Sequence, residues 1–223
     1  MTKASKTRLW VLITAGILLI VAGYFYLPSI LGDTVLPLKY ESNIVKHSKT
    51  YGVDPTWVAA IINQESRFNP NAVSGAGAQG IAQFMPPTFA TTRKEIGRPG
   101  DVFNPDDAIE SLCVHLRDLL SIYNGNMTYA LAGYNAGTGN ADRWIKAGLM
   151  DNIPSSETKK YVVNVANYQK MYAAMYPDQL GITGTVYDTK FEQSSKEIQP
   201  TQTTFWSMFF KQAFGVIKPE SNK

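Results

Sequence analysis

Apolar side chains recur every three or four positions over most of residues 40–177, whereas alternation at every second position is rare. This spacing is typical of amphipathic helices that bury one face. The pattern therefore predicts an all-α domain over residues 40–177. The expected helices cover residues 41–51, 55–65, 87–96, 105 to at least 120, 127–134, 141–147 and 157–176.

Capping residues set most of the expected helix ends. Gly52 and Gly97 favour the left-handed conformation that stops a helix. Asp54 and Asn104 are suitable N-caps, and each is followed by a proline that fits the first helical turn. Ser155 or Ser156 is available to cap the last helix.

The N-terminal residues predict a membrane anchor. Residues 1–8 carry Lys3, Lys6 and Arg8, and residues 9–31 are uncharged and strongly apolar. At about 1.5 Å per residue such a helix is long enough to cross a hydrocarbon core of about 30 Å. The leading positive charges predict a cytoplasmic N-terminus, so the chain after Asp33 is expected outside a bacterial inner membrane that it crosses once. A signal peptide cleaved near Ala22 and Gly23 is the alternative.

The C-terminal residues differ from the helical domain in composition. Residues 178–204 are polar and rich in Thr, Gln and Ser, which predicts a linker. Residues 205–218 place aromatic side chains on or near one helical face, which predicts an amphipathic helix for a membrane surface or a protein partner. The alternative is that this segment folds back onto the domain.

Composition narrows the possible partners and cofactors. The 223-residue chain is 44% hydrophobic with a formal charge of +3, too small and too dispersed to indicate nucleic acid. Cys113 is the single cysteine, so no intrachain disulfide is possible, and its apolar surroundings predict a buried thiol. The two histidines, His47 and His115, lie in helical stretches. We predict neither a metal site nor a cofactor.

Glu65 is the main candidate for chemistry. It falls at the end of the 55–65 helix, where backbone carbonyls and partial burial both disfavour a carboxylate. Both effects raise the pKa toward that of a general acid. No second carboxylate is near in sequence, although folding could bring Glu95, Asp101 or Asp142 close.

A glycine-rich segment follows Glu65. Gly75, Gly77 and Gly80 allow positive φ and a close approach of the backbone to a sugar, and Gln83 offers both a donor and an acceptor. A phosphate-binding loop is excluded, because no Lys-Ser or Lys-Thr pair ends the segment and no strand precedes it.

Three runs in register, 65–86, 133–137 and 157–162, resemble the catalytic domain of the soluble lytic transglycosylases (SLT), a lysozyme-like fold related to goose-type lysozyme. The resemblance covers residues 40–177. It implies cleavage of peptidoglycan glycan strands between N-acetylmuramic acid and N-acetylglucosamine, with a 1,6-anhydromuramic product and Glu65 acting first as acid and then as base. It also implies substrate-binding residues, which are Ser74, Gln83, Met85, Tyr134, Asn135 and Tyr161, and a Tyr161 hydroxyl that reaches the acid.

Two departures and two alternatives accompany this resemblance. Ala82 and Gly133 stand where the family often has methionine and alanine, and we expect both to widen the cleft locally. A goose-type lysozyme-like hydrolase, which adds water, is one alternative function. The other is a non-catalytic glycan-binding module of an envelope-spanning assembly.

Overall fold

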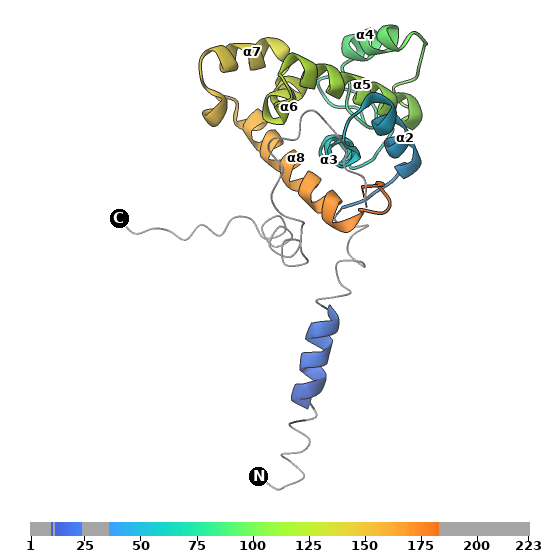
Figure 1. Cartoon of the computed structure of the whole chain (residues 1–223), viewed down its shortest axis with the longest axis vertical. Coiled ribbons are helices and arrows are strands. Elements are labelled where there is room, and N and C mark those ends of the chain that lie inside the picture. The colour runs from blue at the N-terminus through green and yellow to red at the C-terminus, as the bar shows by residue number, and fades with distance from the viewer. Residues whose placement is uncertain (1–9, 11, 24–35, 183–223) are drawn as a thin grey trace, which may run out of the picture. The chain divides into compact units, whose positions relative to one another are not determined.

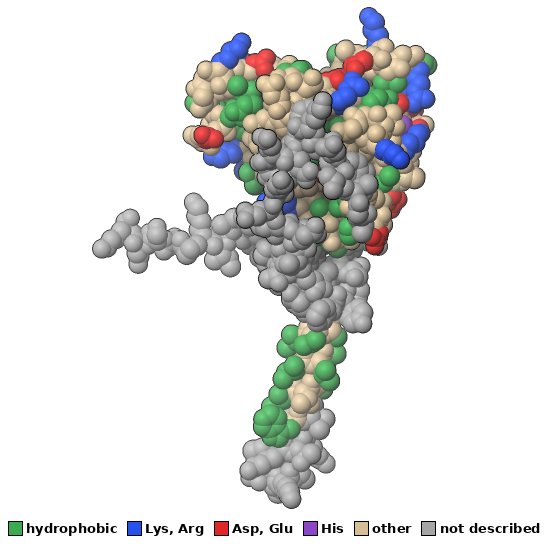
Figure 2. All heavy atoms as spheres, in the orientation of Figure 1, with side chains coloured by type: hydrophobic (Ala, Val, Ile, Leu, Met, Phe, Trp, Pro, Cys, Tyr) green, Lys and Arg blue, Asp and Glu red, His purple; other side chains and the backbone are tan. Residues whose placement is uncertain are grey.

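The computed structural model in Figure 1 describes residues 10, 12–23 and 36–182. The chain forms two compact units, Met1–Pro37 and Leu38–Lys223. In the first unit residues 12–23 are helical, and apolar side chains cover this helix (Figure 2). No helix within the described residues is both long enough and apolar enough to span a membrane. Much of the predicted 9–31 anchor lies outside the described residues, so the anchor stays a prediction.

The second unit is helical, which confirms the all-α prediction. Its described residues contain no β-strand and only two isolated bridges, Val73 with Gln79 and Gln79 with Phe84. The helices in chain order are α2 (Glu41–Tyr51), α3 (Pro55–Ser66), α4 (Pro86–Ile96), α5 (Pro105–Ile122), α6 (Met127–Ala136), α7 (Thr138–Lys146), the short 3₁₀ helix η1 (Met150–Asn152) and α8 (Ser156–Met175).

The core lies where α3 packs on α8 and α2 packs on α5 (Figure 1). Ile61 and Ile62 of α3 and Val165 of α8 are fully buried. The rings of Phe68 and Tyr172 meet with centroids 6.3 Å apart. This packing holds α3 along the length of α8, and the Gln169 amide of α8 also donates to the Thr56 hydroxyl at 3.0 Å.

The predicted caps are present. The Asp54 carboxylate accepts the Thr56 backbone N–H at 2.8 Å, and the Asn104 amide oxygen accepts that of Asp106 at 2.9 Å. Gly52 and Gly97 end α2 and α4 with φ of 68° and 81°. For α8, Ser155 is the residue that caps, through its hydroxyl oxygen and the Thr158 N–H.

Two boundaries differ from the prediction by three residues or more. Helix α7 begins at Thr138 instead of residue 141, because Gly137, with φ 79° and ψ 149°, both ends α6 and starts α7. Packing also continues beyond Pro177, since Leu180 is fully buried and the Ile182 N–H bonds to the Pro177 carbonyl at 2.9 Å. The rest of the predicted linker, and all of residues 205–218, lie outside the described residues.

Cys113 is buried within α5, as predicted. Burial raises the pKa of its thiol to about 12, so the group stays protonated and unreactive at neutral pH. The thiol is therefore a core side chain.

Candidate active site

Glu65 lies in the last turn of α3. The helix ends at Ser66 because Arg67 and Phe68 both adopt the left-handed conformation, with φ of 52° and 63°. The packing of the almost completely buried Phe68 ring offsets the backbone strain of its left-handed conformation. Next to Glu65, the Ser66 hydroxyl donates to the Ile81 carbonyl at 2.7 Å and ties the glycine-rich segment to this helix end.

The carboxyl group of Glu65 has one hydrogen-bond partner among the described residues. The Tyr161 hydroxyl of α8 donates to its Oε1 at 2.7 Å. Burial raises the pKa of Glu65 to about 7, the Tyr161 hydrogen bond acts in the opposite direction, and the charge of Glu157 raises the pKa further. The side chain keeps partial solvent exposure. Glu65 is therefore a carboxyl group that both holds and releases a proton near neutral pH.

Tyr134 of α6 completes a stacked pair with Tyr161. Their rings are nearly parallel, at 9°, with centroids 6.5 Å apart. The Tyr134 hydroxyl donates to the Ala82 carbonyl at 2.7 Å. Burial raises the pKa of both tyrosines, so each hydroxyl remains a neutral donor. Three separate segments, α3, α6 and α8, thus converge beside Glu65.

An aromatic cluster supports Tyr134 from behind. His115 of α5 lies between Tyr134 and Phe84, with ring centroids 5.4 Å and 5.9 Å away. Burial lowers the pKa of His115, so its imidazole is neutral at pH 7. No local sequence signal predicts this supporting role, because these rings meet only when α5, α6 and the glycine-rich segment pack together.

Gln83 and Ser74 hold the glycine-rich segment in shape. Gln83 has a φ of 49°, and its amide nitrogen donates to the carbonyls of Ala72 and Gly80 at 3.1 Å and 2.9 Å. The Ser74 hydroxyl oxygen accepts the Ala78 N–H at 3.0 Å. Gly80 must be glycine, since a Cβ there would lie 2.1 Å from the Val102 carbonyl oxygen. Both predicted sugar ligands therefore have structural hydrogen bonds that the sequence did not reveal.

The remaining predicted site residues are open to solvent to different degrees. Met85 caps α4 and is 45% exposed, and Asn135 is half-buried in the last turn of α6 next to Tyr134. Both are placed to meet a ligand at the surface, and their contact with sugar stays a prediction.

The expectation that Ala82 and Gly133 widen a cleft is wrong. Ala82 is fully buried. Gly133 is also buried, and a Cβ there would meet the Tyr123 ring at 3.0 Å and Leu119 at 3.3 Å. The small residue at position 133 thus lets α6 pack closely on α5 and does not enlarge a sugar site.

The three carboxylates that could have approached Glu65 are engaged elsewhere. Glu95 pairs with Arg117, Asp101 accepts the Phe103 N–H at 2.9 Å, and Asp142 accepts the Tyr123 hydroxyl at 3.1 Å. The acidic residue whose charge acts on Glu65 is Glu157 instead. A sequence signal was available, because Glu157 precedes Tyr161 by four residues on one helix and so shares its face.

The histidines do not form a metal site. The described residues contain no group of three or more His, Cys, Asp or Glu side chains that could hold a metal ion. The Nε2 atom of His47 lies 2.7 Å from the Asp106 carboxylate, on the α2–α5 interface.

Comparisons with known proteins agree with this arrangement. The family model for the transglycosylase SLT domain matches residues 42–153. The chain is 32% identical over 149 residues to soluble lytic murein transglycosylase of Salmonella typhimurium, covering 61% of this chain and 23% of that protein. It is 31% identical over 166 residues to membrane-bound lytic murein transglycosylase C of Serratia proteamaculans, covering 60% and 46%.

A solved structure is similar over the same region. An inactive mutant of lytic transglycosylase Slt from Pseudomonas aeruginosa superposes with a TM-score of 0.60 at 33% identity, covering 64% of this chain and 25% of that one. The chain thus spans less than half the length of each of these relatives. Because the family model matches half of its residues, the chain belongs to the transglycosylase SLT domain family.

Proposed function

We propose that this chain is a peptidoglycan lytic transglycosylase, which cleaves the β-1,4 bond between N-acetylmuramic acid and N-acetylglucosamine without adding water. Membership of the SLT family supports the proposal, as do the names of the relatives, which are lytic murein transglycosylases. The observation that carries it is the pairing of Glu65 with Tyr161 at 2.7 Å, together with a pKa of about 7.

A pKa near the working pH suits a group that must give up a proton and then take one back. In the proposed reaction, protonated Glu65 donates to the bridging oxygen as the bond to C1 of the muramic residue breaks. The departing N-acetylglucosamine keeps that proton on its 4-hydroxyl.

The second half of the reaction uses the substrate's own groups. The acetamido oxygen of the muramic residue stabilises C1, and the 6-hydroxyl oxygen then bonds to C1. Glu65, now a carboxylate, accepts the proton of the 6-hydroxyl, so the 1,6-anhydro ring closes and the enzyme returns to its starting state. The Tyr161 hydroxyl orients the carboxyl group in both steps. We propose that Ser74, Gln83, Met85, Tyr134 and Asn135 line the sugar site.

A hydrolytic reaction, as in goose-type lysozyme, is the second candidate. The nearby charge of Glu157 favours it, because hydrolases use a second carboxylate as nucleophile or to activate water. Glu157 is exposed, and no hydrogen bond joins it to Glu65 among those of the described residues. Because Glu157 is neither buried nor hydrogen-bonded to Glu65, we propose transglycosylation in preference to hydrolysis.

Digestion of purified sacculi in ¹⁸O-labelled water separates the two reactions. Transglycosylation is expected to yield muropeptides that are lighter than the hydrolysis products by one water and carry no label. Labelled reducing ends would instead establish the hydrolase. The matched control is Glu65→Gln, which retains the shape of the side chain and lacks a transferable proton. Products formed by this variant at the normal rate would show that Glu65 is not the acid, whereas a parent chain that binds sacculi and releases no products would favour the non-catalytic, glycan-binding role.

We also propose that residues 9–31 anchor the chain in the inner membrane with the catalytic domain on the outer side. The apolar composition of residues 9–31 supports this, as does a membrane-bound protein among the relatives. Membrane fractionation together with the intact mass of the mature chain tests it. A mature protein that begins near residue 24 would establish a cleaved signal peptide.

A further inference from the structure

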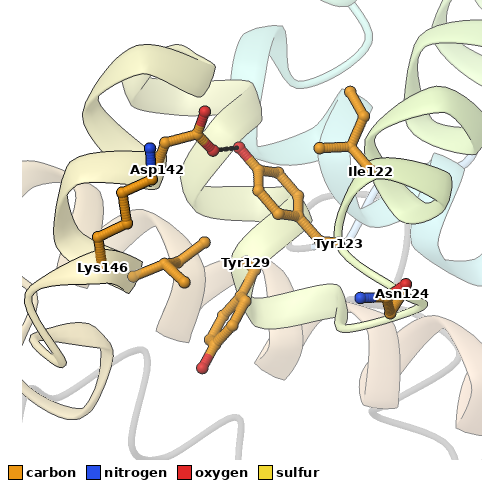
Figure 3. Close-up of a pocket in the computed structure, with 7 residues that line it drawn as sticks. Ile122, Tyr123, Asn124, Tyr129, Asp142 and Lys146 are labelled. Carbon is orange, nitrogen blue, oxygen red and sulfur yellow. Dashed lines mark hydrogen bonds between the residues drawn. The ribbon is translucent and has the colours of Figure 1, made fainter.

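A pocket lies where the end of α5, the beginning of α6 and the second half of α7 meet (Figure 3). Its volume is about 260 Å³. The rings of Tyr123 and Tyr129 meet edge to face in its wall, at 84° with centroids 6.3 Å apart. Ile122 and Ile145 add apolar surface. None of the residues proposed to bind sugar lines this pocket.

Two opposite charges border the pocket one helical turn apart. Asp142 and Lys146 both project from α7 (Figure 3). The hydroxyl of the buried Tyr123 donates to Asp142 at 3.1 Å and fixes the carboxylate in place. Neither Asp142 nor Lys146 forms an ion pair within residues 36–182. A ligand in the pocket can therefore meet both an anion and a cation.

These features fit a small ligand that carries both an ammonium and a carboxylate group. Pockets for drug-sized molecules have volumes of about 300–1,000 Å³, so this one suits one or two amino-acid residues. Tyr129 and the isoleucines can cover the aliphatic part of such a ligand. A neutral sugar would also pack on tyrosine, but it would partly desolvate both charges without pairing either one. Charge complementarity thus favours a peptide end.

The pocket shares helix α6 with the Glu65 site. Tyr129 is in the first turn of α6 and Tyr134 in its last, five residues or about 7.5 Å along the axis. The Tyr123 ring packs directly on Gly133, the residue before Tyr134. Five residues also rotate the helix by about 140°, so Tyr129 and Tyr134 point to different sides of α6. A peptide attached to a sugar beside Tyr134 must therefore run around α6 to bring its end to this pocket.

We propose that the pocket binds the end of a peptidoglycan stem peptide whose terminal residue is a diamino acid, pairing the side-chain ammonium with Asp142 and a carboxylate with Lys146. This assignment rests on the proposed function, because only a wall polymer brings such a peptide to the Glu65 site. The pocket would then distinguish peptide-bearing strands from bare glycan.

Calorimetric titration of the full-length Glu65→Gln chain with a synthetic stem tripeptide tests the proposal. We expect Lys146→Glu to raise the dissociation constant at least 10-fold. Lys49→Glu, an equal charge change at an exposed position of α2, should leave it unchanged. Amidating the tripeptide carboxylates should remove the difference between Lys146→Glu and its parent. Tyr129→Leu should weaken binding of both peptides.

Equal affinity of the parent and Lys146→Glu for the unmodified tripeptide would overturn the assignment. Displacement of the tripeptide by peptide-free N-acetylglucosamine oligomers would also overturn it, in favour of a saccharide site. Sacculus digestion by the chain with Glu65 intact reports on the proposed function separately. Anhydro products without charge-sensitive tripeptide binding would refute the pocket assignment alone, and charge-sensitive binding without anhydro products would refute the reaction alone.

Discussion

Two regions of the domain contain buried carboxyl groups whose pKa values shift in opposite directions. At the end of α3, Glu65 meets the neutral Tyr161 hydroxyl and the like charge of Glu157. Where α2, α4 and α5 meet, Glu110 receives hydrogen bonds from Arg93 at 2.9 Å and from Arg98 at 2.5 Å.

The pKa values follow from the partners. Burial alone raises the pKa of Glu110, but hydrogen bonds from Arg98, Tyr51 and Arg93 outweigh it and hold the pKa below its usual value. The adjacent Asp106, hydrogen-bonded chiefly to His47, has its pKa lowered to about 2. The pKa of Glu65, in contrast, is raised to about 7. Burial is common to Glu65 and Glu110, so the charge of the neighbours separates a proton-exchanging carboxyl group from a structural one.

The largest expected effect is that of Glu65→Gln on activity. Loss of a general acid should lower the rate of sacculus digestion by about 10²–10⁴-fold. A folded-state pKa above the unfolded value means that stability falls as pH rises from about 4.5 to about 7. The glutamine variant should therefore unfold at the parent's free energy below pH 4.5 and be roughly 1–3 kcal/mol more stable above pH 7. Denaturant titrations across this range measure it.

Glu95→Gln is the control for that variant, because Glu95 is an exposed carboxylate paired with Arg117. It should change neither the rate nor the pH dependence of stability. A Glu65→Gln protein with the parent's stability profile would contradict the raised pKa.

Glu110→Gln should lower the free energy of unfolding and leave the rate of sacculus digestion unchanged. It removes a carboxylate from Arg93, whose side chain is 5% exposed, and leaves that buried cation with the Asp107 carboxylate at 3.3 Å as its remaining ion pair. Breaking a buried pair from one side costs about 3–5 kcal/mol, whereas exposed pairs such as Glu95 with Arg117 contribute about 0–1 kcal/mol. Urea unfolding of Glu110→Gln and Glu95→Gln measures the contrast, and equal losses would show that the two pairs do not differ.

Tyr161→Phe should raise the pKa of Glu65 further above its usual value. The hydroxyl stabilises the carboxylate and so lowers the pKa of Glu65, and its loss should raise that pKa. Because the reaction needs protonated Glu65, the alkaline limb of the pH–rate profile should move up by about one unit, the scale of a net hydrogen bond. A profile that falls in rate without moving would limit Tyr161 to orienting the carboxyl group.

Glu157→Gln should shift the alkaline limb of the pH–rate profile to lower pH, by less than Tyr161→Phe shifts it to higher pH. Removing a like charge lowers the pKa of Glu65, but Glu157 is exposed, so we expect a shift below about half a unit that vanishes near 1 M salt. Near-complete loss of activity would contradict this and indicate that Glu157 takes part in the reaction.

Local signals in the sequence predicted most of the helices and the position of Glu65. Asp54, Asn104 and Gly97 act within one turn, so their effect does not depend on the rest of the fold. The run around Glu65 identified both the helix end and the segment that follows.

Features that depend on tertiary packing could not be read in the same way. Gln83 supports its own loop only because the backbone bends back to Ala72, and Gly133 serves the contact between α6 and α5. Glu157 influences Glu65 only once α8 has docked on α3. The contact of Tyr161 with Glu65 was expected from the resemblance, whereas these packing contacts were not.

Tyr161 lies 96 residues after Glu65, on the last helix that the structure describes. Glu65 is therefore synthesised well before Tyr161, whose hydroxyl donates a hydrogen bond to it. A nascent or prematurely terminated chain that stops before α8 contains Glu65 and the glycine-rich segment but lacks Tyr161. In the proposed reaction, the oriented acid is therefore complete only in a chain that has been made and folded through α8.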